Sequence, residues 1–419
     1  MALIHTQSSL RTALRCSEKW SLEYLCNYRS TEEIPPLAQG DVIHAGINAF
    51  WRTQLFLGGH DHSEQCDHSI EPTPCRNCEA IKTAMKKAAE KYEYFSTEEG
   101  QLEYMKIEAL VLSGYVNHWP RYRRADVVAF DLLQQDGPPE IENMLVPVCV
   151  ELRFQEEING IAFAGKFDVV ACPLKYWPDI TKKLYVIDHK STSYKEACQP
   201  GSNFLMKQDM DIQATIYKEA ARKMFKVKDV TFVHDFLVKL PSAMKPLQRV
   251  RRKKTETDEQ FEIRKQENKE SKIDFYERCK GHFHWTPGEH FHRREILTTE
   301  ETHQYLMKDL CQLSKDLESG VFHVMKNPQM CMFGSRPCPF LGYCLGMESL
   351  ETGKFKRLKS PHPELENENG REIPDEDDAT WKSEAAVAPL WGTWDRKDDI
   401  RVSGSKGSVD PNGEGSSRD

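Results

Sequence analysis

Residues Leu184–Thr192, which read Leu-Tyr-Val-Ile-Asp-His-Lys-Ser-Thr, decide the fold of this 419-residue chain. The four apolar residues predict a buried strand, which ends in a carboxylate, a spacer and a lysine. Because side chains alternate along a strand, we expect Asp188 and Lys190 on the same face. A carboxylate that holds a hard cation, beside an ammonium that orients water or stabilises phosphate charge, suits phosphodiester hydrolysis.

The acid-x-Lys triplet is informative only because of its context. Glu267-Asn268-Lys269 and Glu270-Ser271-Lys272 have the same pattern, but they lie in a charged stretch that is typical of solvated surface. Among these triplets, only Asp188-His189-Lys190 ends a four-residue apolar strand.

Two further acids lie on strands upstream of this triplet. Gly165-Lys166-Phe167-Asp168 has the pattern Gly-x-x-Asp, in which the glycine permits a close backbone approach. The alternative is a glycine bulge with a surface aspartate. Glu151 ends the preceding strand and is expected to be a site neighbour or a salt-bridge partner.

Three polar residues on predicted helices complete the pattern. Gln213 and Tyr217 are four residues apart and therefore share a helical face. They are either a polar pair on an apolar helix or residues that contact the DNA backbone and hold the site together. His44, in Gly40-Asp41-Val42-Ile43-His44, lies on a helix before the sheet, and a lone histidine is more often structural than a ligand.

The order Gly-x-x-x-His, Glu, Gly-x-x-Asp, Asp-x-Lys, Gln-x-x-x-Tyr resembles the PD-(D/E)XK nuclease superfamily, in particular its RecB-type branch. The resemblance covers about residues 6–346 and implies a restriction-endonuclease-like mixed sheet flanked by helices. It implies that Mg²⁺ or Mn²⁺ binds His44, Asp168, Asp188 and the His189 carbonyl. It also implies that Lys190 is catalytic and that Gln213 and Tyr217 support it. Phe167 replaces the proline of the usual Pro-Asp pair, a position that is commonly apolar in this branch.

The cysteines give a second sign. A chain with 13 cysteines and no export signal is expected to keep reduced thiols, which favours metal ligation. Cys331, Cys338 and Cys344 lie in a proline-containing loop and need a fourth ligand, which Cys16 can supply. Four thiolates hold either an iron–sulfur cluster or Zn²⁺. The set is similar to the [4Fe–4S] staple of AddB-like RecB-type exonucleases, although the Cys-x₆-Cys gap is longer than expected.

The family pattern does not account for two polar stretches of the sequence. A second zinc ion would have Cys66, Cys75 and Cys78 as ligands, with His60, His62 or His68 as the fourth; the alternative is a flexible polar loop. The basic stretch is either solvated surface or a contact that guides a DNA strand. It comprises Lys245, Arg249, Arg251, Arg252, Lys253 and Lys254.

The predicted architecture is α/β with helical additions. Residues 1–125 form a helical region, residues 126–346 the nuclease core with its Cys-rich closing segment, and residues 347–419 a disordered acidic tail. Strands are expected at Val127–Phe130, Val148–Val150, Ile161–Phe163, Val169–Val170, Leu184–Ile187 and Val230–Leu240. Helices are expected at about Met206–Met224 and Thr298–Ser319, with a charged insert at about Gln248–Lys280.

Composition narrows the class of protein. The net charge of -8 argues against a charge-driven nucleic-acid binder. The sequence has no uninterrupted run of about 18 apolar residues, so no transmembrane helix is predicted. We expect a cytoplasmic protein, or one of the host cytoplasm if the source is a phage. The predicted function is a metal-dependent DNA nuclease in replication, recombination or repair. It would be an exonuclease on single-stranded or free DNA ends, with a helicase or recombination partner. The alternatives are an inactive DNA-binding module of the same fold and a zinc-only structural protein.

Overall fold

The computed structural model describes residues 3–56, 76–118, 145–177, 179–199, 201–247, 257–296, 298–320, 327, 329, 331–333 and 336–365. Its centre is a five-stranded sheet in the order β2-β3-β4-β5-β6. The strands are β2 (Leu145–Ile158), β3 (Ile161–Pro173), β4 (Leu184–Thr192), β5 (Val230–Val238) and β6 (Phe291–Glu295). β4 and β5 are parallel and the other neighbours are antiparallel. The predicted α/β class with a mixed central sheet is therefore confirmed.

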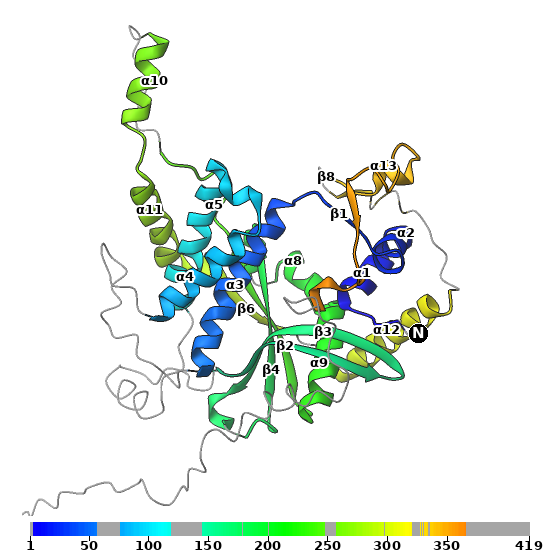
Figure 1. Cartoon of the computed structure of the whole chain (residues 1–419). Coiled ribbons are helices and arrows are strands. Elements are labelled where there is room, and N and C mark those ends of the chain that lie inside the picture. The colour runs from blue at the N-terminus through cyan, green and yellow to red at the C-terminus, as the bar shows by residue number, and fades with distance from the viewer. Residues whose placement is uncertain are drawn as a thin grey trace, which may run out of the picture. The chain divides into compact units, whose positions relative to one another are not determined.

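Helices cover both faces of the sheet (Figure 1). One layer contains α3 (Pro35–Phe56), α4 (Arg76–Ala89), α5 (Glu98–Glu108), the π-helical stretch η3 (Ala109–Tyr115) and α11 (Lys272–Trp285). The other layer contains α1 (Gln7–Arg15), α2 (Ser17–Trp20), α9 (Ile212–Phe225) and α12 (Glu300–Glu318).

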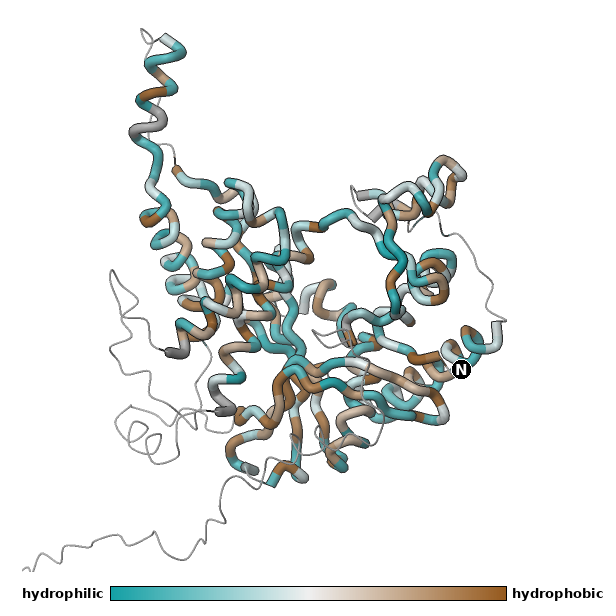
Figure 2. The backbone as a smooth tube through the Cα atoms, viewed as in Figure 1, coloured by the Kyte–Doolittle hydropathy of each residue, from teal (hydrophilic) through white to brown (hydrophobic). Residues whose placement is uncertain are grey.

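Strand alternation produces these two layers. Ile187 and Val233 pack toward α3, whereas Val186 and Phe232 pack toward α9. Figure 2 shows apolar residues concentrated along the central strands, where both layers meet the sheet.

The other described elements are short. They are η1 (Ser21–Leu25), β1 (Tyr28–Ser30), η2 (Glu93–Ser96), α6 (Val116–His118), η5 (Leu174–Tyr176), η6 (Lys195–Cys198), α8 (Asn203–Met206), η7 (Lys207–Met210), α10 (Asp258–Glu267), η8 (Pro287–Glu289), β7 (Met332–Phe333), β8 (Arg336–Pro337), α13 (Leu341–Cys344), β9 (Phe355–Arg357) and η10 (Pro363–Leu365). No helix in the described ranges is long and apolar enough to cross a membrane.

Two predictions about the strands and helices need correction. The predicted strands Ile161–Phe163 and Val169–Val170 are parts of one continuous strand, β3, because Gly165 does not interrupt pairing with β2. The predicted insert at Gln248–Lys280 contains α10 and most of α11, and Phe275 and Cys279 of α11 are fully buried. The predicted strand Val127–Phe130 lies outside the described residues.

The acidic tail begins later than predicted. β9 pairs with β1, Phe355 stacks on Phe340 at 4.9 Å, and Arg29 donates a hydrogen bond to the Pro361 carbonyl at 2.8 Å. The prediction of disorder is therefore wrong for residues 347–365, because backbone pairing and aromatic packing compensate for their few aliphatic side chains. Residues 366–419 lie outside the described part. The described residues all belong to one compact unit, Met1–Ile373, in which the helical region and the sheet pack together.

Candidate active site

The two central carboxylates lie where β3 and β4 separate. The pairing of these strands covers three residue pairs, from Val169↔Ile187 to Ala171↔Tyr185. Asp168 and Asp188 are the next residues beyond the Val169↔Ile187 pair. The His189 backbone N–H donates a hydrogen bond to Asp168 Oδ2 at 2.9 Å. The strand split thus brings the Gly-x-x-Asp acid beside the Asp-x-Lys triplet.

Asp188, Lys190 and Gln213 form a closed triangle of polar contacts. Lys190 Nζ lies 2.6 Å from Asp188 Oδ2 and donates to Gln213 Oε1 at 2.8 Å. Gln213 Nε2 donates to Asp188 Oδ1 at 2.6 Å. Burial alone would raise the pKa of Asp188, but Lys190 and His234 hold it well below its ordinary value. Asp188 is therefore a buried carboxylate that stays ionised.

His44 of α3 approaches Asp168 from the other layer. Its Nδ1 atom lies 3.6 Å from Asp168 Oδ2, and its ring centroid lies 6.1 Å from that of His189. The predicted ligands His44, Asp168 and Asp188 and the His189 backbone are thus gathered around one strand split.

Tyr217 supports the site from within the core. Its ring packs against Phe154 and Phe167 at centroid distances of 5.2 and 5.4 Å. A Cβ atom on Gly165 would lie 2.7 Å from Phe154 Cζ and 3.0 Å from Tyr217 Cε1, so glycine is required by packing. Burial, followed by the charges of Asp188 and Asp168, raises the pKa of Tyr217. The phenol therefore stays protonated, and it lies too deep to be a surface contact for DNA.

Glu151 is a salt-bridge partner at the edge of the site. Its carboxylate lies 2.8 Å from Lys166 Nζ and 2.6 Å from an Arg52 nitrogen. Its φ of 54° is in the left-handed region, which non-glycine residues adopt rarely. Burial would raise the pKa of Glu151, but Lys166 and Arg52 lower it overall. Of the two predicted roles, the described contacts are those of a salt-bridge partner.

Sequence reasoning missed His234 of β5, which is the register partner of Asp188 of β4 in the sheet. His234 is fully buried, with Nδ1 3.1 Å from Asp188 Oδ2 and Nε2 3.2 Å from Asp211 Oδ2. Burial would lower the pKa of His234, but the hydrogen bonds to these two carboxylates raise it. Asp211 also caps α9 by accepting the Gln213 N–H at 2.9 Å, and Arg11 donates to it at 2.7 Å. His234 thus links the site carboxylate to the helix that carries Gln213.

A second buried network lies on the opposite face of the same strands. His189 Nδ1 lies 3.1 Å from Asp235 Oδ2, and the Tyr115 hydroxyl donates to the same oxygen at 2.7 Å. Arg293 Nε lies 3.3 Å from Asp235 Oδ1, and Trp51 Nε1 donates to the Tyr115 hydroxyl at 3.1 Å. Burial would raise the pKa of Asp235, but Arg293 and His189 keep it below its ordinary value. This network fixes the residue whose carbonyl is a predicted metal ligand.

The donors at the strand split fit a hard divalent cation. Two carboxylates and one backbone carbonyl are the oxygen ligands that suit Mg²⁺ and Mn²⁺, and the imidazole of His44 adds a nitrogen donor. Across the described ranges, however, no group of three or more His, Cys, Asp or Glu side chains is already arranged around a metal position. Asp188 instead contacts Lys190, Gln213 and His234.

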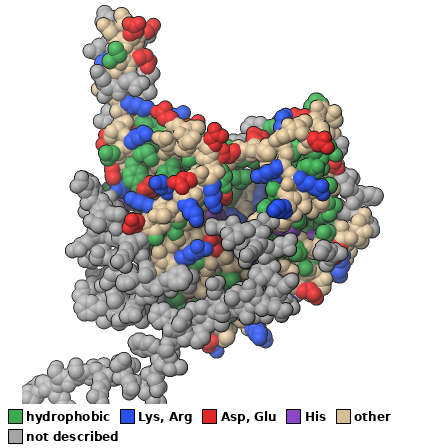
Figure 3. Space-filling model, viewed as in Figure 1, with side chains coloured by type: hydrophobic (Ala, Val, Ile, Leu, Met, Phe, Trp, Pro, Cys, Tyr) green, Lys and Arg blue, Asp and Glu red, His purple; other side chains and the backbone are tan. Residues whose placement is uncertain are grey.

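The face seen in Figure 3 is hollowed between the α3–α5 helices and the end of the molecule that carries α1, α2 and α13. Blue Lys and Arg side chains gather around this hollow in the view. Charge of this sign is what a site for a polyanionic substrate requires.

Of the predicted cluster cysteines, Cys331 and Cys16 lie near enough to Cys338 to affect its pKa. Asn327 donates a hydrogen bond to the Arg15 carbonyl at 2.9 Å, and the Cys338 N–H donates to the Cys331 carbonyl at 2.7 Å. Burial raises the pKa of the Cys338 thiol, and the Cys331 and Cys16 thiols raise it further. Cys344 and Cys338 pack against the buried cluster of Leu22, Phe340 and Phe355.

Two predicted groups cannot be placed. Of the candidate zinc ligands, Cys78 is buried in the core at the start of α4, and Cys66, Cys75, His60, His62 and His68 lie outside the described residues. The second group is the basic stretch, of which the following residues lie outside the described ranges: Arg249, Arg251, Arg252, Lys253 and Lys254.

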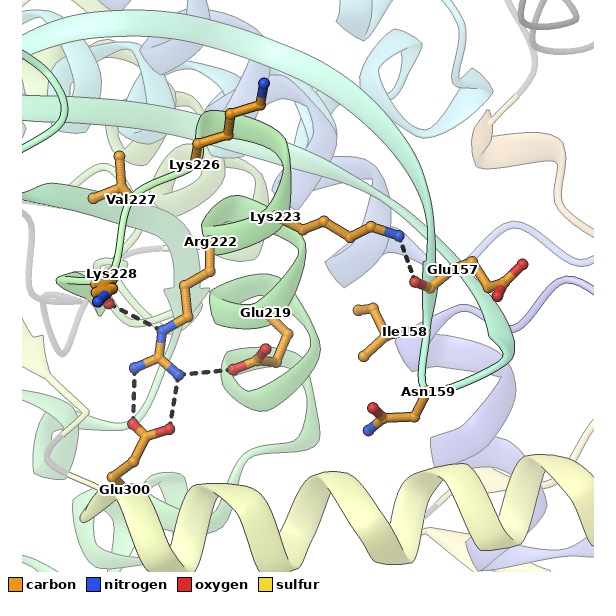
Figure 4. A pocket seen from close by; sticks show the side chains of 10 residues that line it. All are labelled: Glu157, Ile158, Asn159, Glu219, Arg222, Lys223, Lys226, Val227, Lys228 and Glu300. Carbon is orange, nitrogen blue, oxygen red and sulfur yellow. Dashed lines mark hydrogen bonds and ion pairs between the residues drawn. The ribbon is translucent and has the colours of Figure 1, made fainter.

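A pocket of about 710 Å³ lies away from the strand split, at the C-terminal end of α9 (Figure 4). Arg222 contacts Glu300 and Glu219 there, each at 2.8 Å, and Lys223 donates to the Glu157 carbonyl at 2.6 Å. Gln213 and Lys223 are ten residues apart, or about 15 Å along a helix. This pocket is therefore separate from the candidate active site.

Comparison with known proteins identifies the class. The model of the PD-(D/E)XK nuclease superfamily matches residues 5–345, and the chain belongs to this superfamily. A crystal structure of a protein from Eubacterium rectale is named as that of a putative exonuclease. The alignment covers 82% of this chain and 93% of the Eubacterium rectale chain. Its sequence identity is 10% and the TM-score is 0.37. No curated protein matches the chain significantly.

Proposed function

We propose that this chain is a Mg²⁺- or Mn²⁺-dependent deoxyribonuclease. It acts as an exonuclease on single-stranded or frayed DNA ends in replication, recombination or repair. The supporting observation is the strand split, which carries Asp168 and Asp188 side by side with Lys190 and Gln213 bonded to Asp188. An inactive DNA-binding module would have no need to keep this complete set.

His44, Asp168, Asp188 and the His189 carbonyl would hold the cation. When bound, it supplies Lewis acidity and lowers the pKa of a bound water. Asp188 is prepared as a ligand, because its neighbours keep it ionised in a buried position. His189 is held on two sides, by its N–H bond to Asp168 and by its ring contact with Asp235.

Lys190 supplies the positive charge that a reacting phosphate requires. Its side chain is 32% exposed, whereas that of Asp188 is 6% exposed, so the ammonium is the part of the pair that faces solvent. Gln213 holds the ammonium through its oxygen and Asp188 through its nitrogen. The ammonium can therefore orient the attacking water or offset charge that develops on the phosphate.

Cleavage of matched DNA substrates tests this function. The substrates are end-labelled single strands, blunt linear duplexes and covalently closed single-stranded circles, each with Mg²⁺ or Mn²⁺. We expect the single strands and the linear duplexes to give mononucleotides or short products, and the circles to stay intact. We expect Asp188→Asn to abolish cleavage of the single strands and of the duplexes. Cleavage of the circles would show that the protein is an endonuclease and not an exonuclease. DNA binding without any cleavage would show that the protein is a DNA-binding module and not an enzyme.

We also propose that Cys16, Cys331, Cys338 and Cys344 hold a structural [4Fe–4S] cluster, with Zn²⁺ as the alternative. The hydrogen bond from the Cys338 N–H to the Cys331 carbonyl supports this proposal, as does the rise that the Cys331 and Cys16 thiols cause in the pKa of Cys338. Anaerobically purified protein should be brown, and Cys338→Ala should lose the colour and lower the melting temperature. Cys311→Ala, at a buried cysteine of α12, is the matched control and should stay brown. A colourless parent that contains zinc would select the alternative.

The basic run from Lys245 to Lys254 is proposed to guide the DNA strand, and a helicase or recombination protein to supply the ends. Replacing Arg249, Arg251 and Arg252 by Gln should lower the salt dependence of DNA binding, because fewer counterions are released. An unchanged dependence would assign the run to solvated surface.

A further inference from the structure

The chain between β4 and α9 connects two parts of the candidate active site. It leaves β4 directly after Lys190–Thr192 and enters α9 directly before Gln213. Its described residues, 193–199 and 201–211, include η6, α8 and η7. In Figure 1, α8 lies between α3 and α1 at the end of the sheet. This connection therefore borders the candidate active site.

Large apolar side chains of this connection are exposed. Tyr194, Met206 and Met210 have exposed fractions of 64%, 52% and 66%. Single exposed apolar residues are ordinary, but three on one connection beside a polar site make that connection a candidate binding surface. We name Tyr194, Met206 and Met210 the platform.

The platform rests on a packed base. The Tyr194 ring lies 5.9 Å from the Phe204 ring, which lies 5.6 Å from the buried Phe236 ring of β5. Ala197 and Leu205 are buried beneath the same segment. The orientation of the tyrosine is thus fixed on one side while most of its surface faces solvent.

The platform is close to the candidate catalytic groups. Tyr194 follows Lys190 by four residues, which is at most about 13 Å of extended chain. The Tyr194 N–H donates to Thr192 Oγ1 at 3.1 Å, so the chain turns immediately after the strand. A DNA strand whose phosphate reaches Lys190 would carry its neighbouring nucleotides past Tyr194.

The apolar and aromatic side chains of the platform are suited to contact bases rather than phosphates. Lys195, the residue after Tyr194, is paired with Glu289 at 2.9 Å. A flat aromatic ring stacks on any base, and thioethers adapt to irregular apolar surfaces. In a duplex the base faces are already stacked on one another, so they are available only where the strand is unpaired.

We propose that Tyr194 stacks on unpaired bases of the DNA strand that enters the active site, and that the exposed Met206 and Met210 of the same connection add apolar surface for these bases. This inference rests on the proposed nuclease function and adds that the substrate is recognised as single-stranded. It predicts a preference for single-stranded ends over blunt duplex ends that is independent of sequence.

Binding measurements on three variants test the platform. Fluorescence anisotropy is recorded with a labelled single strand and with a blunt duplex, with Ca²⁺ in place of Mg²⁺ to prevent cleavage. Tyr194→Ala should weaken single-strand binding about 5- to 150-fold, the range for loss of one stacked base. Tyr194→Phe, which keeps the ring, should bind like the parent. Tyr305→Ala is the matched control, because Tyr305 of α12 is similarly exposed at 66%.

The outcomes separate the two proposals. If the parent cleaves DNA and Tyr194→Ala binds the single strand as tightly as Tyr305→Ala, the platform is wrong and the nuclease stands. Equal losses of single-strand and duplex binding in Tyr194→Ala would also overturn the platform, since they indicate damage to the whole site. If the parent neither binds nor cleaves DNA, the proposed function fails and the platform fails with it.

Discussion

The two faces of the β4–β5 strand pair carry the same kinds of residue for different purposes. On the face toward α9, Asp188 lies opposite His234, and on the face toward α3, His189 lies opposite Asp235. The first pair continues to Lys190, whose side chain is 32% exposed. The second pair is closed by Tyr115 and Arg293, and its Asp and His are fully buried. Both His–Asp pairs are buried, and the comparison teaches that they differ in their neighbours: only the Asp188 pair contacts a lysine that reaches solvent.

The largest effect is expected on the α9 face. Lys190→Ala keeps Asp168 and Asp188, so the protein should fold and bind DNA, but the chemical step should slow about 10²- to 10⁴-fold. Single-turnover cleavage with saturating Mg²⁺ measures this rate. Lys308→Ala, at an exposed lysine of α12, is the control and should cleave like the parent. Near-normal cleavage by Lys190→Ala would reduce the Asp-x-Lys triplet to an ordinary strand end.

The α3 face should respond through stability. Asp235→Ala leaves Arg293 and His189 without the buried carboxylate that they contact, and should lower the free energy of unfolding by about 3–5 kcal/mol. Urea unfolding monitored by circular dichroism measures the change. A variant as stable as the parent would show that this face has no supporting role.

A smaller effect is expected where His234 positions Asp188. His234→Asn removes an imidazole that contacts Asp188 and Asp211 and should weaken Mn²⁺ binding about 10- to 100-fold with the fold retained. Calorimetric titration measures this affinity. His290→Asn is the matched control, because His290 is also buried but bonds to the Val238 carbonyl. Equal Mn²⁺ affinities of the two variants would remove His234 from the metal-binding role.

The comparison also shows what the sequence could predict. The candidate site residues Asp168, Asp188, Lys190 and Gln213 could be singled out from the sequence, because each follows from local spacing on one strand or helix. Their proximity agrees with the strand split that the structure shows. The sheet class could be predicted because β4 and β5 are short apolar runs with clear ends.

Residues joined across strands could not be predicted. His234 and Asp235 reach the candidate site only through their parallel register with Asp188 and His189, and local spacing along one strand does not reveal which residues of the neighbouring strand are its partners. Arg11 bonds Asp211 across 200 residues of sequence. The polar composition around β9 predicts a disordered tail, whereas its pairing with β1 depends on chain topology.

Mn²⁺ binding by three forms of the protein tests the central claim most directly. Free Mn²⁺ is counted by electron paramagnetic resonance for the parent, Asp188→Ala and Lys190→Ala, without DNA. The parent should bind Mn²⁺, and Lys190→Ala should bind it at least as tightly, because a competing ammonium 2.6 Å from Asp188 is removed. Asp188→Ala should bind it much more weakly, because a charged oxygen ligand is lost. Equal affinities of all three forms, or no binding by the parent, would contradict a metal-dependent nuclease centred on Asp188.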